Sequence, residues 1–153
     1  MNDTPPLNLP PVQLRIRKED NILKVFDRLR GKYVALTPEE YVRQHFTAWL
    51  TGALKYPASL ISNEVSIKLN NTNRRCDTVV FRSDGSPLMI VEYKAPTVTI
   101  DQHVFDQIAR YNLVLRSRFL VVSNGLNHYC CEMDYENDSY SFIAEIPIWN
   151  RNL

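Results

Sequence analysis

Asp77, Glu92 and Lys94 are the residues of this 153-residue chain whose types and spacing could do chemistry. Asp77 and Glu92 lie in two apolar runs that flank Ser83-Asp84-Gly85-Ser86. Asp-Gly between apolar runs is a strong signal for a β-hairpin. A turn centred on this dipeptide pairs Asp77 directly with Glu92, which puts their Cβ atoms about 4.5–5.5 Å apart.

Lys94 completes the group because residues two apart on a strand share a face. Lys94 therefore projects on the side of Glu92, while Val91 and Tyr93 face away. Two carboxylates placed directly opposite each other repel and destabilise the ladder. A divalent metal would compensate, since hard cations such as Mg2+ take carboxylate oxygens and keep waters that a substrate phosphate can replace. A lysine beside it could stabilise charge developing on that phosphate, so the pattern indicates phosphodiester hydrolysis.

The alternative is that these residues carry no chemistry. Asp77 would then end a loop, while Glu92 and Lys94 would be solvated positions on an edge strand. The apolar pairs Val79-Val80 and Ile90-Val91 next to the two acids favour the metal site, because neither segment resembles a solvated edge. Charged residues in a half-buried strand usually need partners or a metal.

A helix is expected just before this group. Thr37-Pro38-Glu39-Glu40 is a capping box, with Thr at the N-cap, Pro at the first helical position and Glu at the third, and the helix should run to about Leu54. Its apolar residues recur at spacings of three and four and form a stripe with Glu39, so Glu39 should point toward the buried side and Glu40 toward the cap. The apolar members are Val42, Phe46, Trp49, Leu50 and Ala53.

The remaining elements predict a layered α/β fold. Asp101 is a plausible cap for a second helix that ends near Leu115, and Asn124-Gly125 should join two paired strands. Helices that can cover both faces of one sheet argue for layers. Strands are expected at 64–69, 77–81, 88–93, 118–123 and 128–133, with weaker strand predictions at 13–17, 22–26 and 33–36 and a helix as the alternative over 22–29.

Composition predicts one intracellular domain. Residues 1–11 hold four of the nine prolines and read as an extended or disordered leader, with a single domain over 12–153 and its core at about 37–134. Three cysteines, two of them adjacent, suit neither a disulfide framework nor zinc knuckles. No apolar run suggests a membrane span, so we expect a cytoplasmic protein. A net charge of +1 neither indicates nor excludes a nucleic-acid partner.

Asp77 followed by Glu92-Tyr93-Lys94 after a hairpin resembles the PD-(D/E)xK nuclease motif. The segments 38–44, 74–77 and 91–96 look like the N-terminal nuclease region of type I restriction enzyme R subunits, and 105–111 looks like that family's Gln-xxx-Tyr element. This resemblance covers about Thr37 to Asp134. Cys76 stands where the motif's name has proline.

The resemblance implies a three-layer α/β/α, restriction-endonuclease-like fold with a central mixed sheet, and DNA cleavage that depends on Mg2+, with Mn2+ as a substitute. It implies a metal held by Asp77, Glu92 and the backbone carbonyl of Tyr93, with Lys94 positioning the attacking water. Glu39 would approach the metal. The pair Gln107 and Tyr111 would shape the active site, although core packing of Tyr111 explains that spacing equally well.

Basic residues near the acidic end of the sheet are candidates for binding the DNA backbone, although a solvated basic rim is the alternative. The candidates are Arg43, Lys68, Arg74, Arg75 and Arg110. Partner chains or a homodimer are expected to complete the assembly, with no membrane. The chain contains no phosphate-binding Gly-xxxx-Gly-Lys-Ser/Thr loop, so we expect no ATP site.

Two functions follow from these residues. The preferred one is a metal-dependent DNA endonuclease domain whose activity can depend on partners. The other is a nuclease-fold module that binds DNA or protein without turnover. The presence of all three of Asp77, Glu92 and Lys94 favours the first, because a purely structural domain has no chemical need of the set.

Overall fold

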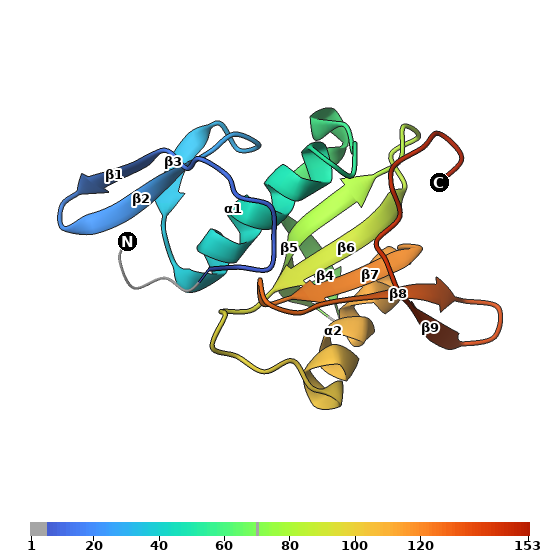
Figure 1. Cartoon of the computed structure of the whole chain (residues 1–153). Coiled ribbons are helices and arrows are strands. Elements are labelled where there is room, and N and C mark those ends of the chain that lie inside the picture. The colour runs from blue at the N-terminus through green and yellow to red at the C-terminus, as the bar shows by residue number, and fades with distance from the viewer. Residues whose placement is uncertain (1–5, 70) are drawn as a thin grey trace.

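The computed structural model describes residues 6–69 and 71–153, without the side chains of Leu69, Thr72, Tyr111 and Val114. The described fold contains one antiparallel sheet, one mixed sheet and two α-helices (Figure 1). The smaller sheet is a meander of three short strands, β1 (Ile16–Glu19), β2 (Ile22–Asp27) and β3 (Lys32–Ala35). Residues 22–27 are therefore a strand, and the helical alternative over 22–29 was wrong.

The larger sheet has six strands in chain order, with bounds β4 (Ile61–Leu69), β5 (Thr72–Phe81), β6 (Pro87–Tyr93), β7 (Phe119–Ser123), β8 (His128–Asp134) and β9 (Ser139–Ile143). Only β6 and β7 pair in parallel, because helix α2 (Gln102–Leu115) connects them as a crossover. The other pairs are antiparallel, so the sheet is mixed. The predicted hairpin through Asn124-Gly125 is confirmed as β7–β8, whereas β9 was not predicted from the sequence.

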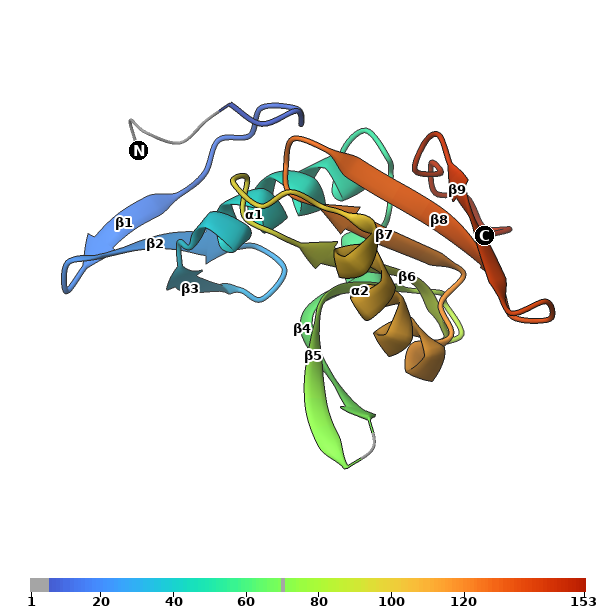
Figure 2. The ribbon, with the colours of Figure 1, turned by 90° about the horizontal axis from the view of Figure 1, so that it is seen from below.

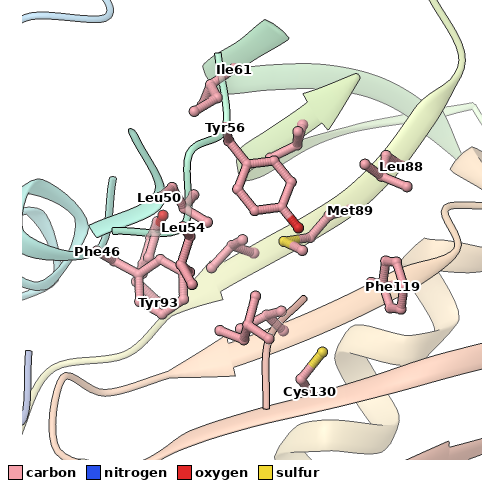
Figure 3. Packing of buried hydrophobic residues seen from close by; sticks show 14 of the residues in the cluster. Phe46, Leu50, Leu54, Tyr56, Ile61, Leu88, Met89, Tyr93, Phe119 and Cys130 are labelled. Carbon is pink, nitrogen blue, oxygen red and sulfur yellow. The ribbon is translucent and has the colours of Figure 1, made fainter. Parts of the chain in front are cut away.

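Helix α1 (Pro38–Thr51) begins as the capping box predicts. The Thr37 side chain accepts a hydrogen bond from the Glu40 backbone N–H over 3.1 Å, and Pro38 occupies the first turn. Val42, Phe46 and Leu50 are fully buried, and they pack with Tyr93 and other residues of the sheet (Figure 3). The apolar stripe therefore anchors α1 against one set of sheet residues, although Ala53 is exposed.

Helix α2 packs in a second apolar cluster. Asp101 caps it by accepting from the Val104 N–H over 2.9 Å, as predicted. Phe105 and Ile108 are buried with Ile90 and other sheet residues that do not belong to the cluster around α1. Since Ile90 packs with α2 while Val91 packs with α1, successive residues of β6 contact different helices.

The N-terminal segment is extended and contacts the domain where the structure describes it. The Asn8 N–H donates to the Gly125 carbonyl over 2.8 Å, and the Asn8 carbonyl lies 2.7 Å from His128 Nε2. Gly125 has φ +85, and a Cβ placed there would lie 2.8 Å from Leu7 Cδ2, so both its conformation and its contact favour glycine. Residues 6–11 therefore contact the domain through Leu7 and Asn8, and residues 1–5 lie outside the described part.

The three cysteines are free thiols and buried, which agrees with the absence of a predicted disulfide framework. Burial raises the pKa of each thiol to about 12. None of the helices in the described ranges is long and apolar enough to cross a membrane.

Candidate active site

Asp77 lies where β5 leaves the main sheet. The pairing of β5 with β6 follows the predicted register from Val80↔Met89 to Thr78↔Val91, and that register places Asp77 opposite Glu92. Next to the turn the prediction was wrong by one residue, because a register shift between Val80 and Phe81 pairs Phe81 with Pro87. Beyond this point β5 pairs only with β4, and Figure 2 shows the β4–β5 hairpin projecting away from the other strands. The Tyr93 backbone N–H donates to Asp77 Oδ2 over 2.9 Å. The Asp77 carboxylate thus accepts a hydrogen bond from the backbone of β6 at the place where the two strands separate.

Glu92 is partly buried beside Asp77. Burial raises the pKa of Glu92 well above its ordinary value, and the negative charge of Asp77, together with a hydrogen bond between the two side chains, raises it further. Lys94 opposes this shift because its positive charge favours the ionised carboxylate. Glu92 is thus influenced by the charges of both Asp77 and Lys94, while a joint catalytic role of the three side chains stays a prediction.

Tyr93 faces away from Glu92, as the strand alternation predicts. Its hydroxyl donates to Thr78 Oγ1 over 2.9 Å, and its ring meets Phe46 of α1 with centroids 5.7 Å apart. The Lys94 backbone N–H donates to the Ser123 carbonyl over 2.9 Å, which continues the pairing of β6 with β7. These contacts fix the backbone on both sides of Tyr93, and with it the backbone carbonyl expected to bind the metal.

Arg43 was predicted to bind DNA, but it is only 7% exposed. Its Nη1 donates to the Asp77 backbone carbonyl over 2.7 Å, its Nη2 donates to Glu64 Oε1 over 2.6 Å, and its Nε donates to Glu40 Oε2 over 3.1 Å. Burial alone would lower the pKa of Arg43, but Glu40 and Glu64 outweigh it and hold the pKa above its ordinary value. A guanidinium held in this way is an internal contact of the site and not a surface for DNA.

The roles predicted for the two glutamates of α1 are reversed. Glu39 is exposed, whereas Glu40 is 4% exposed and accepts hydrogen bonds from Arg43 and Gln44, and from Arg30 over 2.6 Å. The physical reason is that α1 is buried on two sides. Besides its apolar stripe, it carries a polar stripe whose residues are all less than 10% exposed to solvent. These residues are Glu40, Arg43, Gln44 and Thr47.

Glu40 and Arg43 belong to a chain of polar contacts that reaches the small sheet. Arg30, after β2, donates to both Glu40 and Asp27, and Asn63 of β4 donates to Asp27 Oδ2 over 3.1 Å. Asn63 in turn accepts from Thr78 Oγ1 over 2.7 Å. Burial would raise the pKa of Asp27, but the bonds from Arg30 and Asn63 lower it overall. Sequence reasoning missed this network because its members lie far apart in the chain.

The remaining predicted residues are distributed over the outside of the domain. Gln107 and Arg110 of α2 are exposed, and the side chain of Tyr111 lies outside the described residues. Lys68, Arg74 and Arg75 are exposed on the projecting β4–β5 hairpin, with Arg75 Nη1 3.9 Å from Glu64 Oε2. Arg75 also lines a polar hollow of about 420 Å3 together with Arg30, Lys32, Asn63 and Glu64.

Asp77 and Glu92 are the two carboxylates expected to bind a metal. No group of three or more His, Cys, Asp or Glu residues gathers there as a metal site. A cation at Asp77 and Glu92 would therefore need backbone carbonyls, waters or a substrate oxygen to fill its shell, which suits Mg2+ better than Zn2+.

Comparison with solved structures gives a match in fold. A fragment described as an HsdR subunit of a type I restriction enzyme from Vibrio vulnificus YJ016 superposes with a TM-score of 0.53 at 19% sequence identity. The match covers 73% of this chain and 24% of that one, so the chain spans about a quarter of the length of the structure it resembles. No curated protein matches the sequence.

The sequence itself matches a family profile along most of its length. The profile is described as type I restriction enzyme R protein N terminus, and it covers residues 38–147. That range contains α1, the hairpin that brings Asp77 to Glu92, and the crossover helix. Mixed α/β architecture of the same kind is found in the Vibrio fragment. This chain therefore belongs to the type I restriction enzyme R protein N-terminal family.

Proposed function

We propose that the chain is a Mg2+-dependent endodeoxyribonuclease domain of the PD-(D/E)xK type, with the three-layer α/β/α arrangement of restriction endonucleases. The observation that carries the proposal is the placement of Glu92 against Asp77 in a partly buried position. Two adjacent carboxylates are unfavourable unless a proton or a cation neutralises them. Membership of a restriction-enzyme family makes nucleic acid the substrate class to test first.

The residues present fit a divalent cation. Asp77, Glu92 and the Tyr93 carbonyl offer hard oxygen donors, which Mg2+ prefers, with Mn2+ as a substitute. When bound there, the cation would supply Lewis-acid stabilisation of the phosphate and activate a water. Lys94 projects on the side of Glu92 and would hold the attacking water and stabilise negative charge on the phosphate. Glu39 is exposed at the start of α1, and Gln107 is exposed on α2, so both would act only if the substrate brings them into contact.

The DNA backbone would run along the β4–β5 hairpin. Arg75 and Lys68 are exposed there, and Arg75 lies two residues before Asp77 on β5. The polar hollow beside Glu64 adds Lys32, which contributes a further exposed cation at its edge. Arg74 and Arg110 are the other exposed residues among the five basic residues that the sequence predicts to bind the DNA backbone. Phosphate contacts of this kind would position a strand without reading its sequence.

The experiment that tests the proposal is a titration of the purified chain with Mg2+ and Mn2+, following heat of binding and cleavage of mixed DNA substrates. Wild type should bind the metal and cut, and Glu92→Ala and Asp77→Ala should do neither while remaining folded. Lys94→Met should bind the metal and fail to cut, because it keeps both carboxylates but lacks the amine. Unchanged cleavage by Asp77→Ala would remove the assigned site.

The alternative function, a module that binds DNA or protein without turnover, is one outcome of the same titration. Metal binding and DNA binding without cleavage would favour it, unless partner chains restore cutting. The chain spans about a quarter of the matched HsdR fragment. The next experiment therefore repeats the cleavage assay with the other subunits of a type I enzyme added. A cytoplasmic location and assembly with such partners, or with a second copy, belong to this proposal.

A further inference from the structure

Arg43 is the side chain of α1 that reaches the backbone of Asp77. Its Nη1 donates to the Asp77 carbonyl over 2.7 Å, while Nη2 and Nε donate to Glu64 and Glu40. The guanidinium also lies 5.8 Å from the ring centroid of Tyr93, whose N–H donates to the Asp77 carboxylate. Asp77 is thus held from two sides, with Arg43 at its backbone and Tyr93 at its side chain.

The contact occurs at an interruption of the β4–β5 ladder. The register runs from Ile61↔Val80 to Asn63↔Thr78 and resumes at Val65↔Cys76, so Glu64 and Asp77 lie opposite each other between paired residues. Glu64 has φ +59, a left-handed conformation that a residue with a side chain adopts at a cost of about 1–2 kcal/mol. Arg43 binds both members of the interrupted pair. Its guanidinium therefore bridges the strands where their own pairing stops.

The charges around Arg43 explain why an arginine suits this place. Glu40 and Glu64 are carboxylates drawn from α1 and β4, and each lies within 3.1 Å of a guanidinium nitrogen. A planar guanidinium can donate in three directions at once, whereas a lysine ammonium is a compact charge on a flexible stem. Removing the cation would leave Glu40 to Arg30 and Gln44, and would leave Glu64 with the longer 3.9 Å contact to Arg75. Buried charges that lose a partner are costly.

We propose that Arg43 is a positioning residue that fixes the orientation of the Asp77 carboxylate from its backbone side. The part that concerns metal affinity rests on the proposed function. If Asp77 binds the cation, Arg43 sets the metal affinity of the site without contacting metal or substrate. Residues that orient metal ligands typically change affinity by about 10–100-fold when they are replaced.

The test compares Arg43→Lys with Arg30→Gln. Arg30 donates to the same Glu40 but is not bonded to Asp77, so its replacement disturbs the network without releasing Asp77. The first readout needs no metal: the amide proton of Tyr93 reports its bond to Asp77 Oδ2 by NMR. Arg43→Lys should move that resonance toward the value of an unbonded amide, and Arg30→Gln should lower the melting temperature and leave the resonance in place.

The second readout is the dissociation constant for Mn2+ alone. It should rise at least about tenfold in Arg43→Lys and stay within twofold of wild type in Arg30→Gln. Arg43→Lys keeps the charge and is measured first. Glu64→Gln, at the more exposed end of the network, provides a second variant if Arg43→Lys does not fold, and should give a smaller shift of the Tyr93 resonance because it weakens one bond to Arg43.

Each outcome decides the proposal. An unchanged Tyr93 resonance in folded Arg43→Lys, or equal effects in Arg43→Lys and Arg30→Gln, would overturn it. If Arg43→Lys does not fold, an unchanged resonance in Glu64→Gln would overturn it. A wild type that binds no Mn2+ would remove the proposed function and the metal part of the inference, while the Tyr93 resonance would still show whether Arg43 orients Asp77.

Discussion

Asp77 and Tyr93 are joined across the point where β5 and β6 separate, by a hydrogen bond of 2.9 Å from the Tyr93 backbone N–H to Asp77 Oδ2. The bond holds the carboxylate at the end of the shared ladder, next to Glu92. Since Oδ2 has a fixed donor, the carboxylate has one preferred orientation before any ligand arrives. A preorganised first ligand reduces the cost of ordering the site.

Replacing Glu92 by Gln should stabilise the metal-free protein at pH 8 by more than about 1 kcal/mol, because each unit by which folding raises a pKa corresponds to about 1.4 kcal/mol. The reason is that burial and Asp77 raise the pKa of Glu92 in the folded state. Its contribution to stability is therefore complete below its unfolded pKa of about 4.3 and is lost as the pH rises toward the folded value. Urea denaturation at pH 5 and pH 8 measures the difference between variant and wild type.

Metal should favour wild type over Glu92→Gln, which is the reverse of the order of stability expected without metal. Mg2+ should raise the melting temperature of wild type at pH 8 and leave that of Glu92→Gln nearly unchanged, because only the wild type offers two carboxylates to the cation. A melting temperature of Glu92→Gln that rises as far as that of wild type would contradict the assignment of Glu92 as a ligand.

Arg75→Ala should weaken binding of a short DNA duplex several-fold and lower the slope of log affinity against log salt by about 1, as expected for one lost phosphate contact. Arg75 is exposed on the projecting hairpin and lies 3.9 Å from Glu64, so its removal leaves no buried cavity. Fluorescence anisotropy over a series of salt concentrations measures both quantities.

Lys18→Ala is the matched control for Arg75→Ala. Lys18 is an exposed cation on β1 of the small sheet, outside the proposed DNA path. Both variants lose one positive charge, so a general charge effect would weaken binding equally in the two. Equal losses would count against a DNA path along the hairpin.

His128 should make stability depend on pH near neutrality. Burial lowers the pKa of His128 in the folded state, although its contact with the Asn8 carbonyl opposes the shift. The neutral ring is therefore preferred on folding, and its contribution is present above the unfolded pKa of about 6.5 and is lost as the pH falls through the folded value. Wild type should lose stability as the pH falls below about 6.5, and His128→Asn should lose less over the same range.

A histidine control separates this effect from general acid destabilisation. His103 is exposed at the start of α2, so His103→Gln should keep the pH dependence of wild type. Chemical denaturation at each pH provides the free energy of unfolding for the three proteins. Identical curves for wild type and His128→Asn would show that the partly buried ring does not control the pH dependence.

Thr37→Ala should cost about 1 kcal/mol, the typical loss for an N-cap side chain. The Thr37 hydroxyl accepts from the Glu40 N–H over 3.1 Å. Thr37→Ser keeps the oxygen and should retain most of the stability. Thermal unfolding of the two variants and wild type measures the difference, and a neutral alanine variant would mean that Pro38 and the buried Glu40 suffice to start the helix.

The hairpin register and the convergence of Asp77, Glu92 and Lys94 could be predicted because both follow from local rules. A turn dipeptide predicts which residues face each other, and strand alternation predicts which side chains share a face. The capping box of α1 was predictable for the same reason. Each of these depends on residues within one short segment or one hairpin. The register shift between Val80 and Phe81, next to the turn, did not follow from these rules.

The positions of Glu40 and Arg43 could not be predicted in this way. The helical pattern identified one buried stripe, but the second buried side of α1 depends on Arg30 and Glu64, which come from other segments. The left-handed conformation of Glu64 leaves no trace in its residue type. Strand β9 was missed because it is an edge strand of five residues in which Phe142 is exposed, so its apolar pattern is weak.

The bond between Arg30 and Glu40 has a consequence for the evolution of the domain. The family profile begins at residue 38, yet Arg30 and Asp27 precede that limit and complete the surroundings of Glu40. A lineage that exchanged or lost the three-stranded meander would have to supply another cation to this glutamate. The segment that matches the family profile and the segment that supplies the partners of Glu40 therefore have different boundaries in this chain.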